Sequence, residues 1–238
     1  MKQFLYTAYA VWVIGSMALV AQTVNVQSSG NTSVVIRNGR VKATPNVVIG
    51  SGNIVERTVS CKSIHTVIAE GSMDVTWVYS DDPSVVISGD DNIVNLFNIV
   101  GSTGTLRLNS NRSFVSNSAI NVVVYSPTFR RFQHSGSGDI DIQDCSASDF
   151  TVEMKGSGDM RISGSVNNLR LVLAGSGDAD ATGCQAGSVH LRMTGSGDVK
   201  VSCSGRVSGQ MLGAGDLTVF GECAISVINN GAGDIYQY

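Results

Sequence analysis

A four-residue motif, Gly-Ser/Ala-Gly-Asp, returns at nearly constant intervals along the C-terminal part of the chain and constrains the fold more than any other feature. The six copies are Gly136-Ser137-Gly138-Asp139, Gly156-Ser157-Gly158-Asp159, Gly175-Ser176-Gly177-Asp178, Gly195-Ser196-Gly197-Asp198, Gly213-Ala214-Gly215-Asp216 and Gly231-Ala232-Gly233-Asp234. Their first glycines are 20, 19, 20, 18 and 18 residues apart. A period of this length is typical of solenoids, in which each repeat forms one coil. We therefore expect an all-β chain folded as a parallel β-helix or β-solenoid.

The residues on both sides of each motif alternate between apolar and polar, which is the pattern of a strand with one buried face. After the first motif, Ile140 and Ile142 flank Asp141, and before the third motif, Leu171 and Leu173 flank Val172. Each coil is thus expected to supply two strands, with equivalent positions stacked about 4.8 Å apart. Parallel crossovers are right-handed, which predicts a right-handed coil.

The alternation also predicts structural roles for the motif residues. Both glycines of each copy fall on the inward side of a sharp bend, where the missing Cβ would allow the bend and a close approach of opposite walls. The aspartates would stack in a column, in which neighbours about 4.8 Å apart repel by about 0.9 kcal/mol in water. A second column, Asp141, Arg161, Asp180 and Lys200, alternates in sign and is attractive along its length.

Two interpretations of the aspartate column are open. Each carboxylate could accept backbone N–H groups of its own corner, or the column could bind Ca²⁺, which prefers several carboxylate and carbonyl oxygens. The known calcium-binding nonapeptide coils carry their aspartates in a shorter repeat. We therefore favour backbone capping and expect no cofactor and no metal site, with calcium as the alternative.

Four of the five cysteines also recur with the repeat. Cys145, Cys184, Cys203 and Cys223 lie six, six, five and seven residues after their aspartates, and the coil between the first two has Gly164 and Ser165 at this place. Because a disulfide can join only neighbouring coils, Cys184–Cys203 or Cys203–Cys223 could form, whereas Cys145–Cys184 could not. The alternative is a stack of small buried residues that fills the corner.

The first twenty-one residues have the organisation of a secretory signal peptide. Lys2 precedes an uncharged stretch over residues 4–20, and Ala21 is a small residue at the expected cleavage site. We predict an exported protein of the periplasm, outer surface or extracellular space, with no membrane span after the signal; an uncleaved anchor is the alternative. Residues 22–238 carry 15 basic and 19 acidic side chains, a net charge of about −4. Without a Lys/Arg cluster, this charge argues against nucleic-acid binding.

The mature chain divides into three parts. Residues 22–55 are rich in Ser, Asn and Gly and are interpreted as a linker or cap, residues 56–134 as wider and less regular coils, and residues 135–238 as the regular coils. The middle part contains strand candidates at 64–69, 74–79, 84–88, 105–108 and 120–125. The last coil ends without a cap, so we expect it to be covered by residues 22–55, by a partner or by a second copy.

The middle part also carries a specific resemblance. The ordered segments are Val55-Glu56-Arg57-Thr58-Val59, Ile64-His65-Thr66-Val67, Gly71-Ser72-Met73-Asp74-Val75, Val85-Val86-Ile87-Ser88-Gly89-Asp90-Asp91-Asn92, Gly104-Thr105-Leu106-Arg107-Leu108 and Ile120-Asn121-Val122-Val123-Val124. Together with the Gly-Ser-Gly-Asp coils, residues 56–238 resemble the putative auto-transporter adhesin, head GIN domain family. The chain departs from it at Ser72-Met73-Asp74, where a Gly-Ile-Asn signature is expected, and at Cys61. The resemblance implies a β-helix-like exported bacterial protein with a role in adhesion.

Two classes of function are compatible with these features. The first is a non-catalytic adhesin or envelope binding module, with an unknown surface protein or glycan as partner. The second is a β-helix enzyme that acts on polysaccharides, which would need a distinguished pair of carboxylates. The aspartates recur once per coil and none is distinguished, His134 falls in an inward column and His190 faces out. We therefore expect no catalytic residues.

Overall fold

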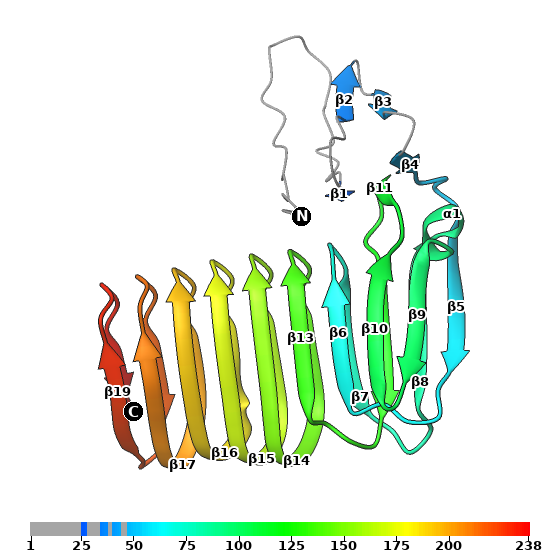
Figure 1. Ribbon diagram of the computed structural model, residues 1–238. Helices are drawn as coiled ribbons and strands as arrows, with labels where there is room; N and C mark the ends of the chain where they lie inside the picture. Colours follow the sequence, from blue (N-terminus) through cyan, green and yellow to red (C-terminus); the bar gives the residue numbers. More distant parts are fainter. Residues whose placement is uncertain (1–24, 28–33, 38–39, 44–46) are drawn as a thin grey trace.

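The computed structural model describes residues 25–27, 34–37, 40–43 and 47–238, and the chain forms a flattened β-solenoid whose coils stack side by side (Figure 1). The strands are β1 (Asn25–Gln27), β2 (Val34–Arg37), β3 (Arg40–Ala43), β4 (Val47–Ile49), β5 (Ile54–Ser60), β6 (Thr66–Glu70), β7 (Asp74–Tyr79), β8 (Ser84–Asp90), β9 (Phe97–Ser102), β10 (Thr105–Ser110), β11 (Ser113–Ser116), β12 (Asn121–Ser126), β13 (Arg131–Gly136), β14 (Ile140–Gly156), β15 (Met160–Gly175), β16 (Ala179–Gly195), β17 (Val199–Met211), β18 (Leu217–Phe220), β19 (Ala224–Asn229) and β20 (Ile235–Gln237). A single-turn helix, α1 (Asp91–Val94), follows β8. The predicted signal peptide, residues 1–21, lies outside the described residues.

The regular coils differ from the expected pair of separate strands. Each of β14, β15, β16 and β17 is one long strand that bends around the solenoid, so its first limb lies in one wall and its second limb in the other. The register slips at the bend, between Ile142 and Cys145 in the pairing of β14 with β15. Asp144 adopts a positive φ of 52° at this bulge. The extra residue turns the chain without ending the backbone hydrogen-bond ladder.

The bent strands produce two opposite walls around one core. One wall runs in the order β19, β17, β16, β15, β14, β13, β6, β10 and β9; the other runs β20, β18, β17, β16, β15, β14, β7, β12, β8 and β5. Inward residues such as Leu171, Leu191 and Val201 are fully buried. Trp77, Phe129, Phe132 and Phe150 form an aromatic cluster where the regular coils meet the N-terminal half.

The N-terminal half forms coils of the same solenoid, but their order in space differs from their order in sequence. The coil β6–β7 lies between the coil β10–β12 and the coil β13–β14. The chain therefore steps across β6–β7 when it passes from β12 to β13. Antiparallel strands β9, β8 and β5 complete the two walls at this end. They occupy backbone groups that a further parallel coil would otherwise pair.

The two ends of the stack differ. The described strands within residues 22–55 include β1 and β4, which pair with β11 beside the N-terminal half, so they do not cover the last coil as one of our expectations had it (Figure 1). Inward residues of the last coil, Ile225, Val227 and Ile235, are only partly buried. No helix in the described part of the chain is long and apolar enough to span a membrane.

Candidate functional site: the motif corners and the two outer faces

The motif glycines permit coils to stack on one another. A Cβ on Gly156 would lie 1.6 Å from the carbonyl oxygen of Gly136, and one on Gly175 would lie 1.8 Å from that of Gly156. These carbonyl oxygens accept the N–H of Ser157 and Ser176 in the next coil, at 3.2 and 3.0 Å. The glycines therefore relieve a close approach between successive coils, and not between opposite walls as the sequence had suggested.

The motif aspartates form a continuous ladder. Each Oδ1 accepts the backbone N–H of the next aspartate along the stack, at distances from 2.8 to 3.0 Å. The seven members are Asp74, Asp139, Asp159, Asp178, Asp198, Asp216 and Asp234. The donated N–H thus belongs to the following coil. We had expected each carboxylate to accept N–H groups of its own corner, and this expectation was wrong. The hydrogen bonds run along the stack and help to offset the repulsion between the carboxylates.

The first member of the ladder explains the departure from the family signature. Gly71-Ser72-Met73-Asp74 is a seventh copy of the corner, because Gly136 and Gly138 stack on Gly71 and Met73. Asp74 accepts the N–H of Asp139, while its own N–H donates to the carbonyl of Ile120. Met73 is buried where the signature has Ile, and an Asn in place of Asp74 could use its Oδ1 in the same way. The structure of the corner therefore survives the substitutions.

The two walls present opposite charges to solvent. We call ladder face the outer side of β7, β18, β20 and the first limbs of β14–β17, with their corner aspartates. Its charged residues are Asp74, Asp139, Asp141, Asp159, Arg161, Asp178, Asp180, Asp198, Lys200, Asp216 and Asp234. Nine carboxylates against two cations give a formal net charge of −7.

We call arginine face the outer side of β6, β10, β13, β19 and the second limbs of β14–β17. Its charged residues are Arg107, Arg131, Lys155, Arg170, Arg192, Arg206, Glu70, Asp149 and Glu153, a formal net charge of +3. Arg131 and Glu153 form the one ion pair of the described chain, at 2.7 Å. This face was not predicted from the sequence, because its cations are far apart along the chain.

The cations of the ladder face are compensated within the protein. Asp180 lies between Arg161 and Lys200 in the register of the first limbs. The hydrogen bond from the Thr182 hydroxyl, with smaller contributions from Lys200 and Arg161, lowers the pKa of Asp180. The column of alternating sign that the sequence predicts is therefore present on this face.

Two histidines occupy the expected sides of the walls. His190 is exposed on the arginine face, with Nδ1 3.3 Å from the Ser208 hydroxyl. His134 points into the core and is 2% exposed, but neither ring nitrogen has a hydrogen-bond partner. Burial lowers the pKa of His134 to about 4, against a smaller opposing effect of Asp139. The inward position that the sequence predicts for His134 is confirmed, and its ring is buried without a hydrogen bond.

The cysteines pack differently from the expected stack. Gly164 pairs in register with both Cys145 and Cys184, and because it has no side chain the two Sγ atoms meet across it at 4.0 Å. The expectation that the intervening coil would keep these two residues apart is wrong for their side chains. Hydrogen bonding with Cys184, and then burial, raises the pKa of the Cys145 thiol.

The other two members of the set lie further along the stack. Cys203 is in register with Ala186 and not with Cys184, while burial and the neighbouring Cys203 raise the pKa of Cys223. All five cysteines are free thiols in the structure. A Cys203–Cys223 bridge stays a prediction.

The Gly89-Asp90-Asp91-Asn92 segment, which the sequence marks as a turn, holds the chain before β5. The carboxylate of Asp90 is buried and accepts hydrogen bonds from the Gly52 N–H and the Ser116 hydroxyl. Asp91 accepts the Ser51 hydroxyl at 2.6 Å. These carboxylates have protein donors, which is a structural role. No group of three or more His, Cys, Asp or Glu residues able to hold a metal occurs in the described part of the chain.

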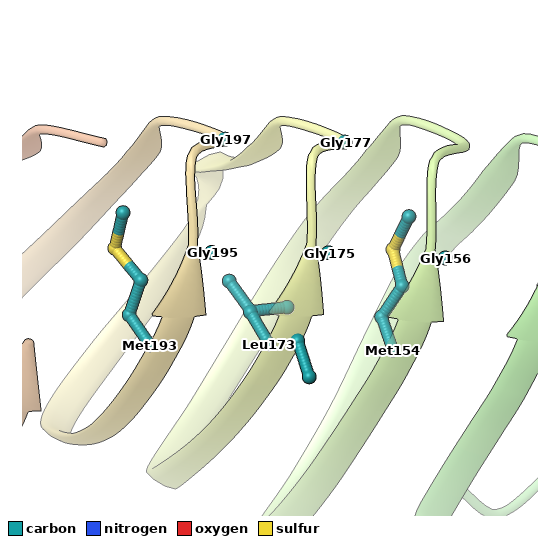
Figure 2. Close-up of a pocket in the computed structure, with 9 residues that line it drawn as sticks. Met154, Gly156, Leu173, Gly175, Gly177, Met193, Gly195 and Gly197 are labelled. Carbon is teal, nitrogen blue, oxygen red and sulfur yellow. The ribbon is translucent and has the colours of Figure 1, made fainter. Parts of the chain in front are cut away.

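The interior has almost no free space at the corners. Met154, Leu173 and Met193 point towards the motif glycines, as Figure 2 shows, and leave a cavity of about 10 Å³. A cavity of this size holds at most one water molecule. The core is therefore packed solid here, and the outer faces are the surfaces on which a ligand could bind.

Comparison with known proteins agrees with this architecture. The sequence profile described as "Putative auto-transporter adhesin, head GIN domain" matches residues 63–223. The fold is similar to a putative adhesin from Bacteroides fragilis NCTC 9343, with a TM-score of 0.66 and 19% identity over 80% of this chain and 100% of that one.

Two proteins from Parabacteroides distasonis ATCC 8503 share the fold as well. A putative adhesin has a TM-score of 0.51 and 16% identity over 81% of this chain and 100% of that one. A putative lipid binding protein has a TM-score of 0.52 and 20% identity over 81% and 99%. No curated protein matches the chain. Since the profile covers more than half of the sequence, the chain belongs to the family described as "Putative auto-transporter adhesin, head GIN domain".

Proposed function

We propose that the protein is an exported, non-catalytic adhesin or binding module of the bacterial cell envelope. The observation that carries the proposal is the contrast between a solid core and two extended, oppositely charged outer faces. A stack of identical coils makes such faces long and rigid, which suits contact with a large partner. The family and the adhesin-named structural neighbours support the same role. A surface protein or a glycan is the partner we expect.

The catalytic alternative has less support. A glycosidase needs two carboxylates in different environments, one protonated and one ionised. The ladder aspartates instead share one environment, because Asp139, Asp159 and Asp178 each accept the next N–H at 2.8 to 3.0 Å. His134 is buried away from solvent and unsuited to proton transfer with a substrate.

A lipid-binding role is suggested only by the name of one neighbour. An acyl chain needs an apolar cavity of several hundred Å³. The apolar cavity at the corners measures about 10 Å³. The hollow of about 180 Å³ between Asp178 and Lys200 is lined by charged residues, and the two of about 510 and 550 Å³ mix apolar side chains with hydroxyl groups and a cation, Lys62 in one and Arg130 in the other. We therefore prefer adhesion through the outer faces.

Adhesion can be tested by display of the full chain on a non-adherent bacterium. Cells that export the protein should attach to mucus-coated or matrix-coated surfaces more than cells that export the Leu171→Asp variant, whose core is disrupted. Leu171 is fully buried, so the charge would prevent folding. Equal attachment of the two strains would contradict the proposal. Release of products from a panel of polysaccharides by the purified protein would favour the enzyme instead.

A further inference from the structure

Three arginines on the arginine face have no hydrogen-bond or ion-pair partner among the residues that the structure describes. Arg170, Arg192 and Arg206 are exposed and make no hydrogen bond or ion pair with the described residues. The nearest acidic residues on this face are already engaged. Glu153 accepts Arg131 at 2.7 Å and Gln133 at 2.8 Å, and Asp149 accepts Asn168 at 2.9 Å. Neither carboxylate forms an ion pair with the three guanidinium groups.

The three arginines form one cluster although 36 residues separate the first from the last. Arg170 pairs with His190, Arg192 lies two residues further on the same strand, and Arg206 belongs to the next coil. With strands about 4.8 Å apart and a rise of about 3.3 Å per residue, the Cα atoms of Arg170 lie about 8 Å from Arg192 and about 12 Å from Arg206. Screening extends over about 8 Å at physiological salt, so the repulsion between Arg170 and Arg192 is only partly screened, whereas Arg206 lies beyond that length.

The opposite face provides a comparison. There Asp180 lies in register between Arg161 and Lys200, so the chain supplies their counter-charge. On the arginine face the one ion pair of the described residues engages Arg131 and leaves Arg170, Arg192 and Arg206 without one. A cluster of unpaired guanidinium groups on a rigid sheet favours ligands with several fixed anionic groups, because a guanidinium binds carboxylate and sulfate through two parallel hydrogen bonds.

The surroundings of the arginines distinguish among anionic partners. The outward residues next to them carry mostly hydroxyl and amide groups: Asn168, Ser188, Thr194, Ser208 and Gln210. Such groups can hydrogen-bond to sugar hydroxyls. A membrane surface is instead bound by apolar and aromatic side chains that enter the lipid. The cross-strand rows of outward residues that contain Arg170, Arg192 and Arg206 hold no Trp, Tyr or Phe, and Ile228 in the last coil is their one large exposed apolar residue.

We infer that the arginine face binds an acidic polysaccharide, a chain of sugars that carries carboxylate or sulfate groups, laid across the second limbs of β15, β16 and β17. The inference rests on the proposed adhesin function and names the ligand class of its surface. Few aromatic residues lie on the regular coils, so sugars have few side chains on which to stack. This does not argue against an acidic glycan, because a glycan held by charge does not need such stacking.

The test compares two variants of the full-length protein that lose the same charge. Arg170→Gln/Arg192→Gln removes two unpaired cations from the arginine face, and Arg161→Gln/Lys200→Gln removes two from the ladder face. Binding is measured at 150 mM NaCl to immobilised heparin, polygalacturonate and neutral dextran, and to vesicles of phosphatidylglycerol and phosphatidylcholine. Thermal unfolding and circular dichroism establish that both variants are folded.

We expect the parent protein to bind heparin or polygalacturonate and not dextran, with affinity that falls as salt rises. The arginine-face variant should bind at least about tenfold more weakly, and the ladder-face variant within about twofold of the parent. Equal losses in the two variants, equal binding to dextran, or binding to the vesicles alone would each overturn the inference. If the arginine-face variant does not fold, Arg192→Gln against Arg161→Gln gives the same comparison.

The adhesion assay separates this inference from the proposed function. Displayed cells that still attach while the purified protein binds neither acidic glycan would leave the adhesin role intact and overturn the glycan. If the purified protein binds an acidic glycan but the displaying cells do not attach, the glycan ligand would stand and the adhesin role would be contradicted.

Discussion

The C-terminal coils and the N-terminal half are built on the same corner, yet only the first reveal it in their sequence. In the C-terminal coils every corner lies between two equivalent corners, so each motif position has the same constraints: no Cβ at the glycines and an acceptor at the aspartate. In the N-terminal half the coil β6–β7 stacks on the wider coil β10–β12, whose connection contains β11. The corner motif therefore repeats in the sequence only where each coil stacks on coils of the same kind, and the shared fold alone does not impose it.

The largest effect should come from a methyl group at a corner. Gly175→Ala would put Cβ 1.8 Å from the Gly156 carbonyl oxygen, and Gly136→Ala would put it 1.8 Å from that of Gly71. Backbone atoms cannot yield as side chains do, so each substitution should cost at least about 4 kcal/mol of unfolding free energy or prevent folding. Urea unfolding followed by circular dichroism measures this.

The control is Gly183→Ala, whose Cβ would lie 3.3 Å from the Ser163 Cβ and 3.4 Å from the Ile162 carbonyl oxygen, far looser contacts than those at the corners. It should change stability by less than about 1 kcal/mol. Because Gly136 joins the two regions, a mild effect there together with a severe one at Gly175 would show that the N-terminal half does not share the corner.

The solenoid could be predicted from the sequence, whereas the seventh corner and the arginine face could not, for physical reasons. The period and the alternation predicted the solenoid, since a stack of equivalent coils imposes both on the chain. The seventh corner was missed because Met73 replaces a glycine where no narrow coil lies beneath it. The arginine face was missed because clustering depends on register, and Arg206 falls beside Ser188 only after the bulges have shifted the pairing.

The second largest effect should be a loss of unfolding free energy at low pH, caused by His134 at the boundary between the two regions. Because its pKa is about 4 in the folded protein and about 6.5 when unfolded, the unfolded chain binds a proton first as the pH falls. The stability contributed by the neutral ring is complete above pH 6.5 and is lost progressively between pH 6.5 and 4. The loss should reach about 3 kcal/mol at pH 4.

Unfolding free energies measured from pH 7.5 to 4 would check this for the parent protein and for His134→Leu. The variant should lack the histidine part of the slope while it keeps that of the carboxylates. Parallel pH profiles would mean that the folded protein binds the proton without penalty.

A smaller effect should come from a rung of the ladder. Asp159→Ala leaves the Asp178 N–H without its acceptor at 3.0 Å, which should cost about 1 kcal/mol. Asp159→Asn keeps an Oδ1 acceptor and removes one negative charge, so it should cost less than about 0.5 kcal/mol. Asp74→Ala should behave as Asp159→Ala does, since Asp139 donates to it at 2.9 Å. If Asn destabilises as much as Ala, the charge and not the hydrogen bond maintains the ladder.

The smallest effect should be that of calcium. Ca²⁺ needs six to eight oxygen ligands around one point, whereas each ladder carboxylate already uses Oδ1 for the next N–H, at 2.8 to 3.0 Å. Among the described residues, no three or more acidic, His or Cys side chains are grouped so that they could hold a metal ion. We therefore expect 5 mM CaCl₂ to leave the melting temperature within about 1 °C of that in 5 mM MgCl₂. Specific sites filled to a hundred times their dissociation constant would add about 2.7 kcal/mol each, so a calcium-specific rise of several degrees would revive the calcium interpretation. Absence of that rise in Asp159→Asn would place the ion on the ladder.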